Sequence, residues 1–171
     1  MIEGLFLEQL QKEEVFEQIE KYISSFVRIR YKDMTRPWGG FLVIEEEDAE
    51  KFIQQFFSHL TKEELSISGK LSPKILLVEP GKKLSWQFHH RRAEIWKLVS
   101  GHAGVIKSDD DSENEIIILE PGDLVELKQG ERHRLIGLEK WGIVAEIWRH
   151  TDAGNPSDED DIVRLQDDFG R

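Results

Sequence analysis

The sequence predicts an all-β domain, an antiparallel sandwich or small barrel, preceded by helices. Eight short β-rich runs follow one another after Pro73, and glycine, proline or acidic turns separate them. Nothing between these runs suggests a βαβ unit. The 171 residues are enough for one well-buried domain and short for two.

Residues 1–70 are expected to form helical and strand elements that pack on the barrel. A helical period of apolar residues runs from about Leu5 to Phe26, and a second one runs from about Ala49 to Leu60. Such stripes indicate packing against a core or against a partner subunit. Two further runs can add strands to the sheet. They are Val27–Tyr31 and Gly39–Ile44.

Residues 71–150 are expected to form the barrel core, within a single domain that spans residues 1–171. The predicted strands are Lys74–Glu79, Leu84–His89, Glu94–Ser100, Ala103–Ser108, Glu115–Leu119, Asp123–Leu127, His133–Leu138 and Trp141–Arg149. Residues 151–171 are acidic and begin with turn residues. A charge run of this kind is usually a solvated segment.

Composition excludes several classes of function. The absence of cysteine rules out disulfides, thiolate metal sites, iron–sulfur clusters and a thiol nucleophile. The formal net charge of −11 repels nucleic acid and anionic membranes, so neither is expected as a partner. Met1–Glu8 has no signal-peptide pattern, and no apolar run is long enough to span a membrane. We therefore expect a cytoplasmic protein.

Four polar residues in two patches are candidate metal ligands. Strand alternation places Gln87 and His89 on one face, Glu94 opens the next strand, and His133 follows a glycine turn. If they converge inside a barrel, they form a mixed nitrogen and oxygen site for one divalent ion. Zinc is our first choice, with iron, manganese, cobalt or nickel as alternatives, because imidazole and carboxylate alone do not select among them.

Glycines at regular distances flank these four residues. The ordered positions are Gly81, Gln87, His89, Glu94, Gly101, Gly122, Gly130 and His133. This spacing resembles the two motifs of the cupin superfamily, which implies a cupin double-stranded β-helix, or jelly-roll barrel. Gln87 stands where the first histidine of His-x-His is usual, and Lys128 replaces the usual proline of the second motif. A Gln-x-His start resembles the phosphomannose isomerases, whose metal site is built from Gln, His, Glu and His.

Four ordered segments extend the resemblance to the cupin domain of type II phosphomannose isomerase, or mannose-6-phosphate isomerase. They are Arg36–Gly39, Leu84–Trp96, Gly130–Leu135 and Glu159–Arg164 with Asp167, Gly170 and Arg171. In larger members this domain follows a sugar-nucleotide transferase domain, whose activity is not implied here. Arg91 and Ile95 replace two of the family's histidines, but residue parity places both away from the face of Glu94.

The resemblance implies a metal-dependent aldose–ketose isomerase acting on a small phosphorylated sugar. The metal would act as a Lewis acid, and a basic side chain would anchor the phosphate. Arg92 shares the parity of Glu94 and falls on the family's functional arginine, so it is the first catalytic candidate. Lys74, Arg134 and Arg164 are further candidates to bind the substrate, although the parity of Arg134 is opposite to that of His133.

The sequence leaves two candidates for the general base. Glu146 lies mid-strand, on the face opposite Ile143, Ala145 and Ile147, which is either the cavity or an exposed face of the sheet. His90 is the other candidate, if its turn folds inward.

Two other functions compete with the isomerase. One is a cupin that binds a sugar phosphate without turnover, and the other is an iron-dependent cupin oxygenase, since two histidines and a carboxylate also suit iron. A homodimer is expected, because the apolar helices before residue 60 can cover a sheet edge or a dimer interface.

Overall fold

The computed structural model describes residues 10–171. The start of the first predicted helix, from Leu5 to residue 9, lies outside the described residues. Helix α1 (Lys12–Ile23) begins at a capping box in which the Glu14 carboxylate accepts the Gln11 N–H at 2.9 Å. The other N-terminal elements are β1 (Ile29–Asp33), β2 (Gly39–Ile44), the 3₁₀ turn η1 (Glu46–Asp48), α2 (Ala49–Phe56) and α3 (Lys62–Leu65).

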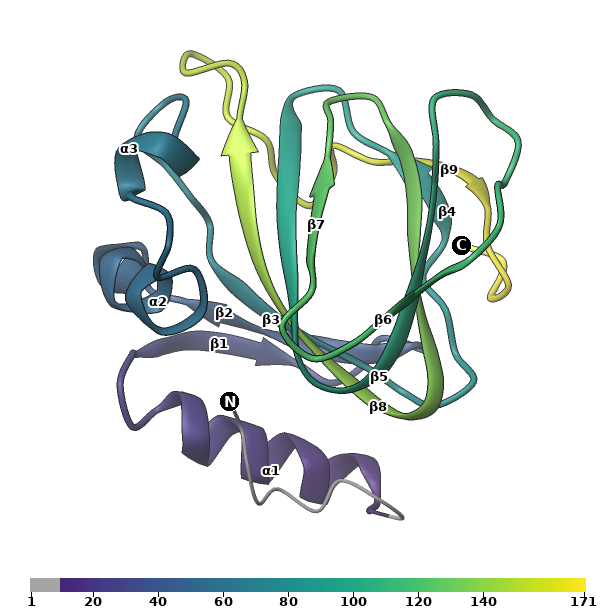
Figure 1. Ribbon diagram of the computed structural model, residues 1–171, viewed down its shortest axis with the longest axis horizontal. Coiled ribbons are helices and arrows are strands. Elements are labelled where there is room, and N and C mark those ends of the chain that lie inside the picture. The colour runs from purple at the N-terminus through teal and green to yellow at the C-terminus, as the bar shows by residue number, and fades with distance from the viewer. Residues whose placement is uncertain (1–9) are drawn as a thin grey trace.

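The rest of the chain forms the barrel. Its strands are β3 (Lys74–Val78), β4 (Trp86–Phe88), β5 (Arg92–Ser108), β6 (Ile117–Leu119), β7 (Leu124–Leu127), β8 (Arg132–His150) and β9 (Val163–Gln166). Every strand pair is antiparallel, in the order β1-β2-β3-β8-β4-β9, and β5 pairs with β6, β7 and β8. The predicted class is confirmed: an all-β cupin jelly roll with N-terminal helices (Figure 1).

Two of the predicted strand breaks are wrong. Gly101 lies inside β5, and residues 139–140 lie inside β8. Gly101 has φ 86°, and a Cβ there would lie 1.7 Å from the Trp141 carbonyl oxygen, so glycine is needed where the two long strands meet closely. The register shifts on either side of it show that Gly101 bends a continuous strand instead of ending one.

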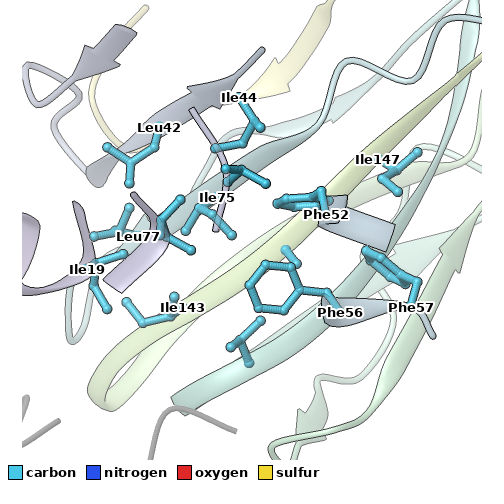
Figure 2. Packing of buried hydrophobic residues seen from close by; sticks show 14 of the residues in the cluster. Ile19, Leu42, Ile44, Phe52, Phe56, Phe57, Ile75, Leu77, Ile143 and Ile147 are labelled. Atoms are coloured by element: carbon cyan, nitrogen blue, oxygen red, sulfur yellow. The ribbon is translucent and has the colours of Figure 1, made fainter. Parts of the chain in front are cut away.

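Strand alternation divides the apolar residues into two clusters. On the outer face, helices α1 and α2 cover the sheet, with Ile19 and Phe52 against Leu42, Ile75 and Ile143 (Figure 2). The second cluster fills the barrel interior. It includes Leu76, Trp96, Leu127 and Val144. The inward face of β3, β5 and β8 therefore also carries the site residues described below.

The C-terminal segment is not solvated throughout, which corrects the expectation for residues 151–171. Ser157 and Asp161 are buried, and β9 pairs with β4. The segment leaves β8 and crosses to the opposite side of the barrel (Figure 1). None of the helices within residues 10–171 has the length and apolar character needed to cross a membrane.

Candidate metal centre

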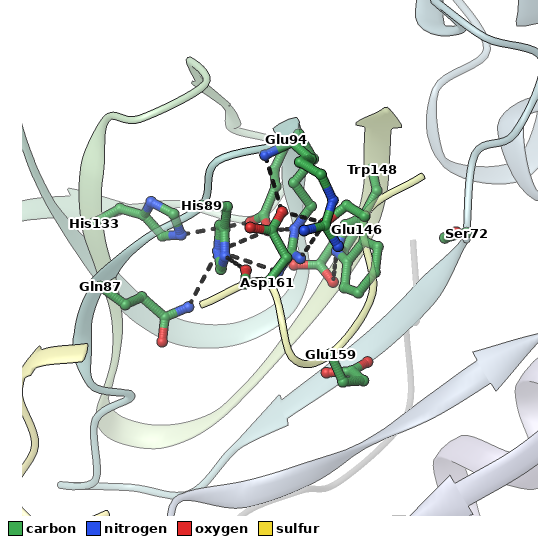
Figure 3. A network of polar contacts seen from close by, with 12 residues as sticks. Ser72, Gln87, His89, Glu94, His133, Glu146, Trp148, Glu159 and Asp161 are labelled. Atoms are coloured by element: carbon green, nitrogen blue, oxygen red, sulfur yellow. Dashed lines mark hydrogen bonds and ion pairs between the residues drawn. The ribbon is translucent and has the colours of Figure 1, made fainter. Parts of the chain in front are cut away.

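Three of the four predicted ligands converge in the barrel interior. The ligand atoms of His89, Glu94 and His133 all lie within 4.8 Å of one another, and all three residues are buried. The Oε1 atom of Glu94 lies 3.2 Å from His89 Nε2, and its Oε2 atom lies 3.6 Å from His133 Nε2 (Figure 3). They meet because β4 pairs Gln87 with His133, while Glu94 faces inward from β5.

Hydrogen bonds set the tautomers of both histidines. His89 Nδ1 lies 2.6 Å from the Asp161 carbonyl and His133 Nδ1 lies 2.9 Å from the Glu131 carbonyl. A carbonyl only accepts, so each Nδ1 carries the hydrogen and each Nε2 presents a lone pair. Burial lowers the pKa of both imidazoles, that of His89 to about 3, so both are neutral at pH 7.

This donor set fits a divalent metal ion. The buried Nε2 of His133 has no hydrogen-bond partner within residues 10–171, which is costly unless something else uses its lone pair. Burial is the largest single influence on Glu94 and would raise its pKa, but the charge and hydrogen bond of Arg92 and the two neighbouring histidines together outweigh it and hold that pKa well below its usual range. Two neutral imidazoles and one carboxylate are ligands for zinc or another divalent transition metal.

Gln87 lies beside the trio with its oxygen turned away. Its Oε1 accepts a hydrogen bond from Ser85 Oγ at 2.6 Å, and its Nε2 lies 3.5 Å from His89 Nε2. A half-turn of the amide exchanges the two atoms, and Ser85 Oγ can then accept from Nε2. Gln87 therefore lines the site, and its oxygen reaches the histidines only in the turned orientation.

Arg92 is buried, and internal partners use its donors. Its Nε lies 2.7 Å from Glu94 Oε1, and its Nη1 donates to Ser157 Oγ at 2.8 Å and to the Asp158 carbonyl at 3.0 Å. Its Nη2 lies 3.1 Å from His89 Nε2, and the guanidinium stacks 3.6 Å from the Trp148 ring centroid. In this structure Arg92 orients two of the candidate ligands, and these contacts occupy the donors that a phosphate would need.

Glu146 faces the cavity and is buried, so the alternative of an exposed sheet face is wrong for this residue. Its carboxylate accepts the indole N–H groups of Trp96 at 2.8 Å and Trp148 at 2.9 Å. Burial, together with the negative charge of Glu94, raises the pKa of Glu146 to about 8. The other base candidate, His90, is exposed, and its ring packs edge-on against Phe88.

An open pocket of about 340 Å³ joins several of the predicted residues. Gln87, Arg92, Glu94 and Glu146 line it together with Lys74 and Arg164. Arg134 does not line it. Its guanidinium donates to the Glu113 carboxylate at 2.6 Å and to the Leu84 carbonyl at 2.9 Å.

Nine further residues line the pocket, and four of them bear on its chemistry without having been among the predicted site residues. They are Arg36, Phe41, Trp148 and Glu159. Arg36 stands in the Arg-Pro-Trp-Gly segment, which was the available signal. Glu159 lies in the acidic run, where no strand pattern indicated a place in the barrel.

Comparisons with known proteins agree with this geometry. The model of the family "Mannose-6-phosphate isomerase C-terminal" matches residues 54–167. Xanthan biosynthesis protein XanB of Xanthomonas campestris pv. campestris is 29% identical over 142 residues, which are 82% of this chain and 24% of the relative. Mannose-1-phosphate guanylyltransferase of Escherichia coli is 28% identical over 141 residues, which are 82% of this chain and 23% of the relative. The chain thus spans about a quarter of the length of these relatives.

Solved structures share the fold. Vicilin from Solanum lycopersicum superposes with a TM-score of 0.53 at 20% identity, over 82% of this chain and 35% of that one. Capsular polysaccharide assembling protein CapF from Staphylococcus aureus superposes with a TM-score of 0.51 at 17% identity, over 80% and 34%. The family match covers more than half of the chain, and the chain therefore belongs to the mannose-6-phosphate isomerase C-terminal family, with the cupin barrel described above.

Proposed function

We propose that the chain is a metal-dependent aldose–ketose isomerase whose substrate is a small phosphorylated sugar such as mannose 6-phosphate. The observation that carries the proposal is the buried cluster of His89, Glu94 and His133. Its Glu94 lines a pocket together with Glu146 and four basic side chains. The family supports a phosphorylated sugar of the mannose series as the substrate.

The residues that would hold the ion are His89, Glu94 and His133, with Gln87 in its turned orientation. The ion, zinc as first choice, would supply a Lewis acid that polarises the sugar carbonyl. Glu146 would move the proton between the neighbouring carbons. A carboxylate whose pKa is raised to about 8 is a stronger base than an exposed one, and it becomes fully ionised only above neutral pH unless a bound cation lowers that pKa.

Arg164 and Arg36 are our candidates for the phosphate anchor. Both line the pocket. Burial and the nearby charge of Arg171, with a further contribution from Arg36, lower the pKa of Arg164. Positive charges gathered in this way favour an anionic ligand. Arg92 would hold the ligands and the Trp148 ring in place, instead of contacting the phosphate directly.

The test is to identify the metal in the purified protein and then to assay interconversion of mannose 6-phosphate and fructose 6-phosphate by the metal-loaded chain. Turnover that is lost on chelation and regained on adding the metal supports the proposal. Sugar-phosphate binding without turnover would favour a binding module. Oxygen consumption by the iron-loaded protein would favour an oxygenase. The homodimer and the cytoplasmic location stay predictions, which light scattering and cell fractionation can check.

A further inference from the structure

Lys74 is a buried cation between two aromatic rings. Its residue is 5% exposed, and its Nζ lies 3.5 Å from the ring centroid of Trp148 and 5.3 Å from that of Phe41. The ammonium pairs with the carboxylate of Glu159. An ammonium in such a site needs an anion beside it, because burial removes most of its hydration.

The anion beside Lys74 comes from the C-terminal segment and is replaceable. The Glu159 side chain is 47% exposed, and Lys74 is its only ion-pair partner within residues 10–171. The lysine is therefore held by the barrel, whereas the carboxylate approaches it from the solvent side. Because the Glu159 side chain is half exposed, an anion from solvent can compete with it for Lys74.

A second cavity of about 310 Å³ lies on the other side of this ion pair. Lys74, Trp148 and Glu159 line both cavities, so they form the wall between the second cavity and the metal pocket. Arg30 and Lys70 also line the second cavity, and neither makes an ion pair in the described part of the chain.

The other carboxylates of the second cavity already have partners inside the protein, and that of Asp158 also pairs with Arg91 at 3.4 Å. Glu46 accepts the N–H groups of Leu71 at 2.6 Å and Ser72 at 2.9 Å, and Asp158 accepts those of Asp160 and Asp161, both at 3.0 Å. Three cations therefore face a space whose remaining acids are already hydrogen-bonded. Ser72, also in this wall, holds a left-handed backbone with φ 45°, the kind of strain that is enriched at binding sites.

We propose that this second cavity is an anion-binding subsite for a phosphoryl group, with Lys74, Lys70 and Arg30 as its cations. Glu159 occupies Lys74 when the ligand is absent and is displaced when it binds. The subsite is separate from the phosphate anchor at Arg36 and Arg164. If the proposed function holds, a bisphosphorylated or diphosphate-linked sugar would reach from the metal pocket into the second cavity through the place that Glu159 vacates.

The test is a titration of the full ¹⁵N-labelled chain with inorganic phosphate, followed by amide chemical shifts. We expect one set of shifted amides at residues 70–74 and 157–160. The double substitution Lys70→Gln and Arg30→Gln should weaken phosphate binding at this set by about fivefold or more, and Glu159→Gln should tighten it severalfold. The double substitution should leave the phosphate response around Arg164 unchanged, whereas Glu159→Gln can affect it, because Glu159 lines both cavities. Lys82→Gln, which removes an exposed lysine outside both cavities, is the matched control.

Two results would overturn the subsite. One is the absence of phosphate-dependent shifts at residues 70–74, even if shifts appear around Arg164. The other is equal tightening by Glu159→Gln and Asp160→Asn. Asp160 is a neighbouring acid that makes no ion pair with residues 10–171, so an equal effect would indicate general charge alone. The probe is inorganic phosphate and not a sugar. Phosphate binding at the second cavity can therefore be confirmed or refuted even if the isomerase assay fails.

Discussion

The imidazole of His89 donates its Nδ1 hydrogen to the backbone carbonyl of Asp161, 2.6 Å away and 72 positions later in the sequence. The carboxylate of the same Asp161 accepts the N–H groups of His90 and Arg91, both at 3.0 Å, and the Ser157 hydroxyl at 2.6 Å. One residue of the C-terminal segment therefore orients a candidate metal ligand and also holds the turn from which that side chain projects.

Loss of the Asp161 carboxylate should weaken metal binding. We expect Asp161→Asn to lower zinc affinity by about tenfold or more, because groups that orient metal-bound histidines typically contribute 10- to 100-fold. Competition with a chromogenic chelator measures the change. Asp160→Asn is the control, since it removes the same charge from an exposed neighbour. Equal affinities for wild type and Asp161→Asn would show that the carboxylate does not position His89.

Removal of the His133 imidazole should lower zinc affinity more than removal of the Gln87 amide. We expect His133→Ala to lower zinc affinity by about 100-fold or more, because its Nε2 lone pair has no other use in the site. Gln87→Ala should lower zinc affinity by only about tenfold, because the Gln87 oxygen must turn away from Ser85 before it can reach the ion. Metal content is measured by elemental analysis after dialysis against dilute zinc. Full metal content in both variants would mean that the site is assigned wrongly.

Glu146 should control turnover and its pH dependence. If it is the base, Glu146→Gln lowers kcat by roughly 10²- to 10⁴-fold while zinc content is retained. The base acts only when it is ionised, so wild-type activity should rise with pH through the pKa of Glu146. Burial and the charge of Glu94 raise this pKa to about 8 in the metal-free protein, and a bound cation would lower it. Glu139→Gln, an exposed position on the same strand, is the control. Full activity in Glu146→Gln would remove Glu146 from the reaction.

His150 should make the protein less stable in mild acid. Its Nδ1 accepts the Ser157 N–H at 2.9 Å and its Nε2 lies 2.9 Å from Ser72 Oγ, so the folded protein holds it neutral. Burial lowers its pKa to about 4, below the value of about 6.5 in the unfolded chain. The unfolded state therefore binds the extra proton between those two values, and the free energy of unfolding should fall by about 2 kcal/mol from pH 7.5 to pH 5 on account of this residue.

Urea unfolding at the two pH values measures the effect of His150. In His150→Asn the amide oxygen can still accept the Ser157 N–H, but the titratable group is gone. His89 and His133 contribute a pH dependence of the same sign in both proteins, so the comparison isolates His150. An identical fall in wild type and variant would contradict the expectation.

Much of the barrel and of its inward face was predictable from the sequence. Alternation along β5 correctly separates Glu94 from Ile95, which packs in the outer cluster. The same alternation shows which face of β8 carries Glu146 but not whether that face is covered. Burial of Glu146 depends on two indoles that donate to its carboxylate. Trp96 reaches it from the neighbouring strand β5, and Trp148 reaches it from two positions further along β8.

The role of the C-terminal segment was not predictable in the same way. Asp161 is buried because its carboxylate accepts backbone N–H groups of a distant turn. Such a contact produces no periodic pattern in the sequence that could predict it. Lys74 is buried because rings from β2 and β8 flank it, although a lone lysine is usually exposed. Gly101 is a turn residue by type, yet the close approach of Trp141 makes it a bend within one strand.

The contact between Asp161 and His89 also has a consequence for how the protein acquires its site during folding. The long strands β5 and β8 can pair before residues 157–166 dock, because those residues follow all the other site residues in the chain. Contacts between residues so far apart in sequence require closure of a large loop and tend to form late. Refolding should therefore show two events, with burial of the tryptophans first and tight zinc uptake only after the last segment has closed over His89.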